Sequence, residues 1–360
     1  MNAKGIEADF YQCRGIKSFN GQDVTLFVHY EVFTRTFTLL LVDENNVAHT
    51  VDTIPGNIID DVMFVENTDE LQIYYRVEST NFVIMTLDST FSIVARHYQS
   101  FNSTPATYTR CALSDGYYLL CGVSGLVEPS VFIDTHAQSD LALAQSILID
   151  SAVPSSDYQA SDNNQNVSLF LQEDRTFWLQ FKNDSGNIIS NQIVVSDSGD
   201  VVVHERIFSI EHDAIGFMMG AYDADYSRVV TAFSQDKGDV FLHQQPVFSE
   251  SKAGMAAREE SLVKVNVTSG EYSRPYLAMN ANKFFLGWQE EERITTNSVS
   301  RASFVTLSEE HFVQEDNPGQ VVFTVDGIGQ LYGSFVTHST NDDLFGRDYL
   351  VNQHLSSITE

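Results

Sequence analysis

Asn67-Thr68-Asp69-Glu70-Leu71-Gln72-Ile73-Tyr74-Tyr75-Arg76-Val77 is the stretch that decides the fold. A polar turn leads directly into a run of apolar and aromatic residues, and a second apolar run at 82–87 follows after a short loop. The apolar positions alternate or run continuously, which is typical of a β-strand, and they lack the 3.6-residue spacing of an amphipathic helix. The stretch therefore predicts two strands joined by a hairpin.

The same turn and strand recur seven times along the chain. The strands that follow these turns begin at positions 24, 71, 117, 167, 215, 284 and 331, so five of the six offsets lie between 46 and 50 residues and one is 69. Further strands are expected at 36–42, 82–87, 177–182, 228–233 and 344–351. We take the recurring strand as the second of each unit. Four short strands per unit of this length are the sequence form of a propeller blade.

The seven units resemble the β-propeller superfamily over essentially the whole chain, and the resemblance is one of architecture. The Gly-His and Trp-Asp marks of one large class are missing, as are the paired glycines of kelch repeats and the Ser-x-Asp-x-Gly-x-Thr-Trp box of sialidases. No functional subfamily is recognised, so no catalytic residue is carried over from a family. The resemblance implies an all-β fold, a seven-bladed β-propeller of four-stranded blades.

Residues 1–360 are expected to form a single propeller domain. We expect residues 6–11 to supply the outermost strand of the seventh blade and so to close the ring, which removes an open sheet edge. The long offset marks an insertion at 246–275. Its segment 251–262 is rich in Ala, Met, Glu and Leu, which favours a helix. Such an insertion could bind a partner or simply cover the rim.

Composition limits the partners. Forty-nine acids against 20 bases give a formal net charge of −29. The resulting field repels nucleic acid and anionic membranes, and it attracts basic proteins and metal cations. An acidic surface would equally suit a saline environment. The three cysteines have no metal-binding spacing, and we expect them to be small buried side chains.

The first ten residues lack the basic start and apolar core of a signal peptide, and no apolar run approaches the length of about 20 residues that spans a bilayer. We therefore expect a protein made in the cytoplasm, with a virion as one location.

The loops after the recurring strands all contain carboxylates. If these loops gather on one face, they form an acidic ring that would bind a cationic partner or a divalent cation. With 49 acids in the chain, a carboxylate in every loop could also arise by chance. The predicted ring, which we call the acidic crown, consists of Glu31, Glu78, Glu128, Glu173, Asp174, Asp223, Asp225, Glu290, Glu291, Asp342 and Asp343.

No residue is assigned a catalytic role, and no cofactor is expected beyond the divalent cation just mentioned. The chain contains no Gly-x-Ser-x-Gly elbow, no His-Glu-x-x-His motif and no phosphate-binding Gly-rich loop ending in Lys. Trp178 and Trp288 lie in predicted strands and are expected in the core, and the histidines His29, His97 and His243 are expected to be structural.

These observations favour a non-enzymatic scaffold or protein-interaction propeller, one version of which is a structural component of a phage virion or tail. The alternative is a carbohydrate-active propeller, either glycan-binding or hydrolytic, that uses the acidic crown. An enzymatic role is left open, although the missing motifs argue against it. The expected partners are proteins, including basic ones, with a glycan as the alternative.

Overall fold

The structure is a computed structural model of the 360-residue chain. It describes residues 10–31, 34–45, 47–55, 59–77, 80–103, 105–124, 130–151, 167–183, 185–211, 215–235, 238–247, 261–266, 275–290, 293–313, 318–325, 331–339 and 347–354. The chain divides into two compact units. Unit 1 comprises residues 1–98 and 278–360, and unit 2 comprises residues 99–277.

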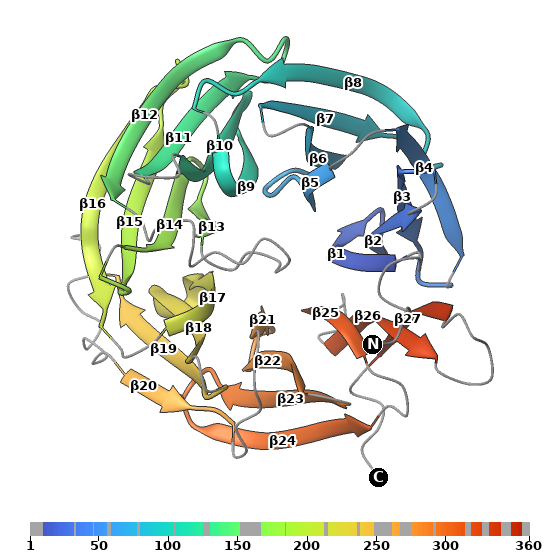
Figure 1. Cartoon of the computed structure of the whole chain (residues 1–360). Helices are drawn as coiled ribbons and strands as arrows, with labels where there is room; N and C mark the ends of the chain where they lie inside the picture. The colour runs from blue at the N-terminus through green and yellow to red at the C-terminus, as the bar shows by residue number, and fades with distance from the viewer. Residues whose placement is uncertain are drawn as a thin grey trace. The chain divides into compact units, whose positions relative to one another are not determined.

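Unit 2 contains three antiparallel sheets of four strands (Figure 1). Their strands are β9 (Pro105–Ser114), β10 (Tyr117–Ser124), β11 (Ser130–Ala137) and β12 (Leu143–Ser151); β13 (Val167–Glu173), β14 (Thr176–Lys182), β15 (Ile188–Val195) and β16 (Val201–Ile210); and β17 (Ile215–Asp223), β18 (Arg228–Gln235), β19 (Val240–Pro246) and β20 (Ser261–Lys264). The sheets lie face to face, with the first strands β9, β13 and β17 on one side of the unit and the fourth strands β12, β16 and β20 on the other.

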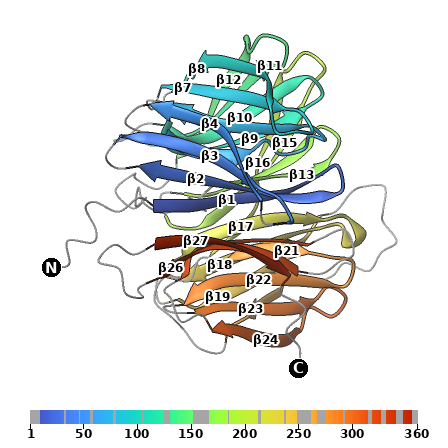
Figure 2. The same cartoon turned by 90° about the vertical axis from the view of Figure 1, so that its right-hand side faces the viewer.

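Unit 1 is built from sheets of the same kind (Figure 2). Three have four strands, namely β1 (Phe10–Phe19), β2 (Gln22–Glu31), β3 (Thr36–Val42) and β4 (Ala48–Pro55); β5 (Ile59–Phe64), β6 (Leu71–Val77), β7 (Asn81–Leu87) and β8 (Ile93–Ser100); and β21 (Tyr276–Met279), β22 (Lys283–Glu290), β23 (Arg293–Ser300) and β24 (Thr306–Val313). The described residues of the last sheet form three strands, β25 (Pro318–Val325), β26 (Leu331–Ser339) and β27 (Arg347–His354).

The all-β architecture predicted from the sequence is confirmed. Each of the seven recurring strands is present, and the third strand expected at 36–42 is found with the same bounds as β3. The described strands form six sheets of four strands and one of three. Closure of these sheets into a seven-bladed ring, like the single-domain organisation, stays a prediction.

Two details of the sequence analysis differ from the structure at the ends of predicted elements. Phe10 and Tyr11, expected in a closing strand of the last blade, instead pair with Tyr30 and His29 in the first sheet. The other residues of that predicted strand, 6–9, lie outside the described residues. Of the predicted helix at 251–262, the described residues Ser261 and Leu262 begin strand β20, because they pair with Gln244 and His243.

In two sheets the recurring strand does not have the place that the sequence analysis gave it. The recurring strand is second in most sheets, but β13 and β17 are the first strands of theirs. The strand β16, which precedes β17 in sequence, pairs with β15 and so completes the preceding sheet. A constant offset fixes the period of a repeat but not the point at which one unit ends and the next begins, so the pattern could not reveal this shift.

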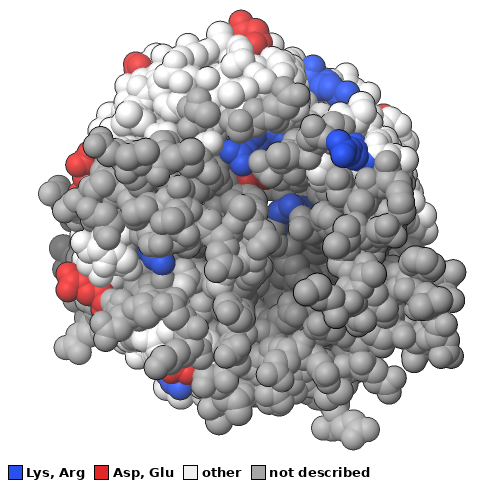
Figure 3. Space-filling view, viewed as in Figure 1, with Lys and Arg blue, Asp and Glu red and all other residues white. Residues whose placement is uncertain are grey.

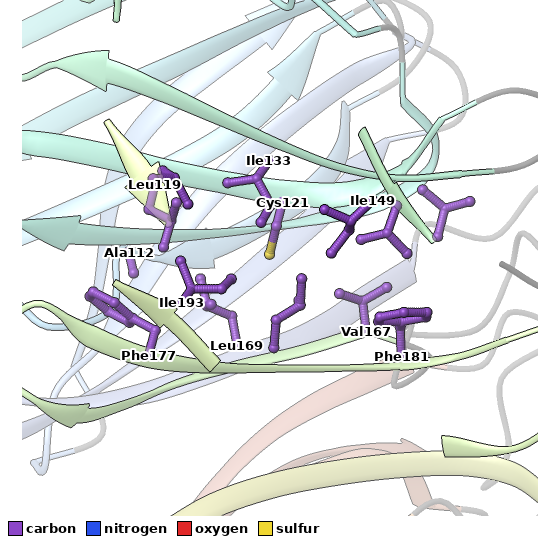
Figure 4. Close-up of a cluster of buried hydrophobic side chains, with 14 of the residues drawn as sticks. Ala112, Leu119, Cys121, Ile133, Ile149, Val167, Leu169, Phe177, Phe181 and Ile193 are labelled. Atoms are coloured by element: carbon purple, nitrogen blue, oxygen red, sulfur yellow. The ribbon is translucent and has the colours of Figure 1, made fainter. Parts of the chain in front are cut away.

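Apolar contacts between neighbouring sheets make the core. In unit 2, side chains of β10 and β11 point toward side chains of β13 and β14 (Figure 4). Cys121 and Leu119 face Leu169 and Phe177 across this gap, and all four are buried. Burying one such aliphatic or aromatic side chain stabilises a fold by about 1.5–3 kcal/mol. In unit 1 the same packing joins β2 and β3 to β6 and β7.

Cys111 and Cys121 are free and buried, as expected, and Cys121 belongs to the core between β10 and β13; the side chain of Cys13 lies outside the described ones. Burial raises the pKa of the Cys121 thiol to about 12. Trp178 and Trp288 are also buried, which confirms their expected place in the core.

Polar turns in three of the hairpins share one hydrogen-bond pattern. Asp43 accepts hydrogen bonds from the backbone N–H groups of Asn45 and Val47, at 2.9 Å each. Asp88 accepts from the N–H groups of Thr90 and Ser92 at 2.8 and 3.1 Å, and Asn183 uses its side-chain oxygen in the same way. A short side chain that bonds to the backbone two residues later is typical of an Asx turn. These residues therefore fix the hairpins that lead into the fourth strands β4 and β8 and into the third strand β15.

The sheets that contain β13 and β17 approach each other closely at Gly220. A Cβ atom at this position would lie 2.2 Å from Phe170 Cε1 and 2.3 Å from Gln180 Oε1. The Gly220 N–H donates to Ser168 Oγ at 3.0 Å, and the Gln180 side-chain N–H donates to Thr231 Oγ1 at 2.8 Å. Glycine at 220 thus allows a hydrogen-bonded seam between the two sheets.

Gly220→Ala is expected to lower the free energy of unfolding by about 1–3 kcal/mol, because the added methyl group would overlap Phe170 and Gln180. Urea unfolding followed by the fluorescence of the buried Trp178 measures the change. Gly15→Ala is the control, since its Cβ would lie 3.6 Å from Phe64, an ordinary contact. Equal stability of the Gly220→Ala variant and the native chain would contradict the close approach.

Asp88→Asn is expected to reduce the dependence of thermal stability on pH in acid. The hydrogen bond from the Thr90 side chain, together with those from the Thr90 and Ser92 N–H groups, holds the pKa of Asp88 below its usual value of 3.8. A lowered folded-state pKa stabilises the fold above the unfolded-state pKa, and this stabilisation is lost as the pH falls through the folded-state pKa.

Melting temperatures measured from pH 7 to pH 2 test this expectation. The difference between the native chain and Asp88→Asn should be constant above about pH 5 and should shrink below about pH 4. A difference that does not change with pH would contradict the role of the ionised carboxylate.

Candidate functional site

Most residues of the predicted acidic crown have side chains outside the described ones. Glu31 ends β2 and Glu290 ends β22, but only their backbone is described. Outside the described residues altogether lie Glu78, Glu128, Glu291, Asp342 and Asp343. The described members are Glu173, Asp174, Asp223 and Asp225. The crown as a whole stays a prediction.

The four described members lie at the ends of two first strands. Glu173 ends β13, Asp174 is in the turn that follows, Asp223 ends β17, and Asp225 is in the short 3-10 helix η3 (Ala224–Tyr226). Neighbouring strands of an antiparallel sheet run in opposite directions, so a first strand and a second strand finish at opposite ends of the sheet. These four carboxylates therefore do not occupy the position within the sheet that Glu31 and Glu290 occupy after second strands.

Tyr222 connects two of these carboxylates electrostatically. Burial raises the pKa of Tyr222, a hydrogen bond with Ser227 lowers it, and the charges of Glu173 and Asp223 raise it further. The structure therefore brings Glu173 and Asp223, from neighbouring sheets, close to one phenol group. Glu173, Asp174 and Asp225 are exposed, whereas Asp223 is fully buried.

Asp223 is part of a buried ion pair. Its Oδ2 accepts hydrogen bonds from Arg228 Nε at 2.9 Å and from Arg228 Nη2 at 2.8 Å. The guanidinium also donates to Gln244 Oε1, and its carbon lies 4.6 Å from the centre of the Tyr226 ring. These contacts hold the β17–β18 connection in place. Asp223 is thus engaged in supporting the fold rather than presented to a ligand.

The described residues give no sign of a metal site at this end of the sheets. Within the described part of the chain, no group of three or more His, Cys, Asp or Glu side chains is arranged to hold a metal ion. On the face shown in Figure 3, the described Asp and Glu residues form small separate patches, some of them beside Lys or Arg. The divalent cation stays a prediction.

A second candidate surface, which the sequence analysis missed, consists of apolar residues on the fourth strands. We call the fourth strands β4, β8, β12, β16, β20 and β24 the outer strands; like the first strands, each ends its sheet and pairs on one side only among the described strands. All ten described large apolar side chains that are exposed lie on an outer strand or next to one. They are Val47, Val94, Tyr98, Leu143, Leu148, Val202, Ile207, Leu262, Val305 and Leu307.

A signal for this surface was present in the sequence. In β8 the residues alternate between half-buried and exposed, and the exposed set contains Val94 and Tyr98 as well as Arg96. Apolar residues on both phases of an alternating strand indicate that the strand has two apolar faces. The sequence does not show that one of these faces is exposed, because exposure depends on which strand ends the sheet.

Comparison with solved structures establishes the fold. The β-propeller domain of Cps50 (Swd1) from Myceliophteria thermophila matches with a TM-score of 0.52 and 9% identity, over 91% of this chain and 96% of that one. The WD40 domain of Toxoplasma gondii coronin matches with a TM-score of 0.56 and 9% identity, over 96% and 87%. The chain is a β-propeller.

The same fold also occurs in a protein named as an enzyme. Prolyl oligopeptidase B from Galerina marginata matches with a TM-score of 0.52 and 8% identity, over 92% of this chain and 47% of that one. No family model and no curated protein matches the chain. Because a propeller supports many functions, function has to be argued from the surface of this chain.

Within the described part of the propeller, no helix is both long and apolar enough to cross a membrane.

Arg228→Met is expected to lower the free energy of unfolding by about 3–5 kcal/mol, because it leaves the buried Asp223 carboxylate without its partner. The double variant Asp223→Asn/Arg228→Met should be more stable than Arg228→Met alone, since it no longer buries an uncompensated charge. Chemical unfolding of the single and double variants measures both effects.

Asp225→Asn is the matched control for this pair. Asp225 is exposed two residues from Asp223, and surface substitutions change stability by about 0.5 kcal/mol or less. If Arg228→Met were no more destabilising than Asp225→Asn, the ion pair would not be what holds the β17–β18 connection.

Proposed function

We propose that the chain is a non-enzymatic protein-interaction propeller that binds its partner along the outer strands. One observation carries this proposal. The described large apolar side chains that are exposed all lie on or beside outer strands. Single exposed apolar residues are common on any protein surface, but their concentration at one structural position is typical of an interaction surface.

Outer strands are also suited to binding through the backbone. A strand that ends a sheet has N–H and C=O groups without partners in the sheet, and proteins commonly protect such edges with charged residues or proline. β12 carries Asp150 as its one charged residue, and it has no proline. Its exposed residues include Leu143 and Leu148. An edge of this composition favours contact with another chain.

The alternative of a carbohydrate-active propeller receives less support from the described residues. That hypothesis needs carboxylates that can act on a ligand, and Asp223 is fully buried in its pair with Arg228. Glycan binding, a basic partner and a structural role in a virion or phage tail stay predictions. The interaction function proposed here includes such an assembly as one setting.

Site-specific photo-cross-linking tests the proposed function. A benzophenone amino acid is placed at Val94, Leu148 or Leu262 on three different outer strands, in cells of the source organism. We expect one or more of these positions to cross-link a defined protein, which then forms a complex with the chain when both are purified. Gln22, an exposed residue at the start of β2, is the control position.

Cross-linking to the same protein with equal yield at Gln22 would show contact without preference for the outer strands. A chain that is folded by circular dichroism but cross-links nothing at any outer-strand position would contradict the proposal. Turnover of a glycan by the purified chain would replace it with the carbohydrate-active alternative.

A further inference from the structure

The outer strands β12 and β16 of unit 2 are fixed next to each other where they begin. The side-chain oxygen of Gln145 accepts a hydrogen bond from the backbone N–H of Val201. Thr135 Oγ1 donates to the backbone oxygen of Gly199 at 2.7 Å. Both hydrogen bonds join a side chain of the β9–β12 sheet, Gln145 on β12 and Thr135 on β11, to the backbone around the start of β16.

Gly199 makes this approach possible. A Cβ atom at Gly199 would lie 2.5 Å from Cε1 of Tyr117 and 3.0 Å from Cβ of Ala144, so a side chain here would force the strands apart. Arg175 adds a further link between the two sheets, because its guanidinium pairs with both Asp115 and Asp197. The two outer strands therefore behave as one prepared surface rather than as independent edges.

Apolar side chains lie on both strands of this surface. Leu143 and Leu148 on β12 are 44% and 62% exposed, and Val202 and Ile207 on β16 are 54% and 48% exposed. Leu143 pairs with His136 of β11, and Leu148 pairs with Phe132. These two partners are four residues apart and so lie on one face of β11. Leu143 and Leu148 are five residues apart, and a β-bulge between them brings them to the same face of β12. An even spacing such as that of Phe132 and His136 is typical of side chains on one face of an extended strand.

Negative charge surrounds these apolar residues. Residues 138–151 and 196–211, which contain the two strands and their turns, have one basic residue, Arg206. They contain six acidic residues, Asp140, Asp150, Asp197, Asp200, Glu205 and Glu211. Of these, Asp140 and Asp200 are exposed just before the two strands, and Glu205 and Glu211 are exposed on β16 and just after it. Such a surface attracts a basic segment.

We propose that β12 and β16 bind an extended, basic segment of a partner protein, which adds as a strand to the edge of β12 or β16 that pairs with no described strand. Apolar side chains of the segment contact Leu148 and Ile207, and its Lys or Arg residues face the surrounding carboxylates. A second copy of this chain is the less suitable occupant, because each copy has a formal net charge of −29. This proposal rests on the proposed interaction function and specifies its site.

A synthetic peptide of nine alternating Val and Lys residues, labelled with fluorescein, is the probe. Fluorescence anisotropy with the full chain should show saturable binding that weakens as salt is added. Hydrogen exchange should slow at backbone amides of 143–151 or 201–210 when the peptide is bound. A peptide with Glu in place of Lys should not bind, and one methylated at alternate amide nitrogens should bind less tightly because it cannot add as a strand.

Two pairs of substitutions locate the binding. Leu148→Ser/Ile207→Ser should weaken binding of the peptide roughly fivefold or more. The matched control, Val94→Ser/Tyr98→Ser on β8, removes exposed apolar residues from an outer strand of unit 1 and should leave the affinity unchanged. Any one of three results would overturn the proposal. The two double variants could lose affinity equally, the methylated peptide could bind as tightly as the unmethylated one, or hydrogen exchange could slow only outside β12 and β16.

Failure here can be told apart from failure of the proposed function. If the Val and Lys peptide does not bind, while a partner cross-links at Val94 or Leu262, the site proposed on β12 and β16 is wrong and the interaction function stands. If neither the peptide nor any cross-linked partner is found, both are wrong.

Discussion

Each central sheet must bury both of its faces against neighbouring sheets, and the rest of the structure depends on this constraint. The sheet of β13 to β16 shows it most clearly, because it packs against β10 and β11 on one side and makes the Gly220 seam on the other. Its second strand, β14, is buried along nearly its whole length. A strand with two buried faces has no room for a polar face, which is why second strands such as β10 and β14 consist mainly of apolar residues.

Buried polar groups set how the sheets align within this apolar packing. Gln180 donates to Ser190 within its own sheet and to Thr231 of the next sheet, at 2.9 and 2.8 Å. Buried hydrogen bonds of this kind require one relative position, whereas apolar contacts tolerate several. The Asp223–Arg228 pair acts in the same way at the end of β17. The acidic composition therefore does not translate directly into an acidic site, since one carboxylate predicted for the crown is used inside the fold.

Much of the fold could be predicted from the sequence, and the candidate site could not. Turn residues such as Asp43 and Asp88 and the apolar runs after the turns are local signals, and they located strands such as β3 and β7 closely. The place of a strand within its sheet is a pairing property, so β13 and β17 were assigned to second place although they are first. The exposure of Leu148 depends on the same property, because the described exposed apolar residues lie on or beside strands that end their sheets. The carboxylates at the ends of the first strands β13 and β17 were consequently grouped with carboxylates at the ends of second strands, such as Glu31.

The division of the chain into units bears on the order in which it can fold during synthesis. Unit 2 is one continuous segment, 99–277, so all its strands are available before the final 83 residues, 278–360, have been made. Unit 1 needs residues 1–98 to find partners in 278–360, and loop closure over so long a separation is slow. The first two sheets must therefore wait on the ribosome with part of their apolar surface unpacked while the middle of the chain becomes compact.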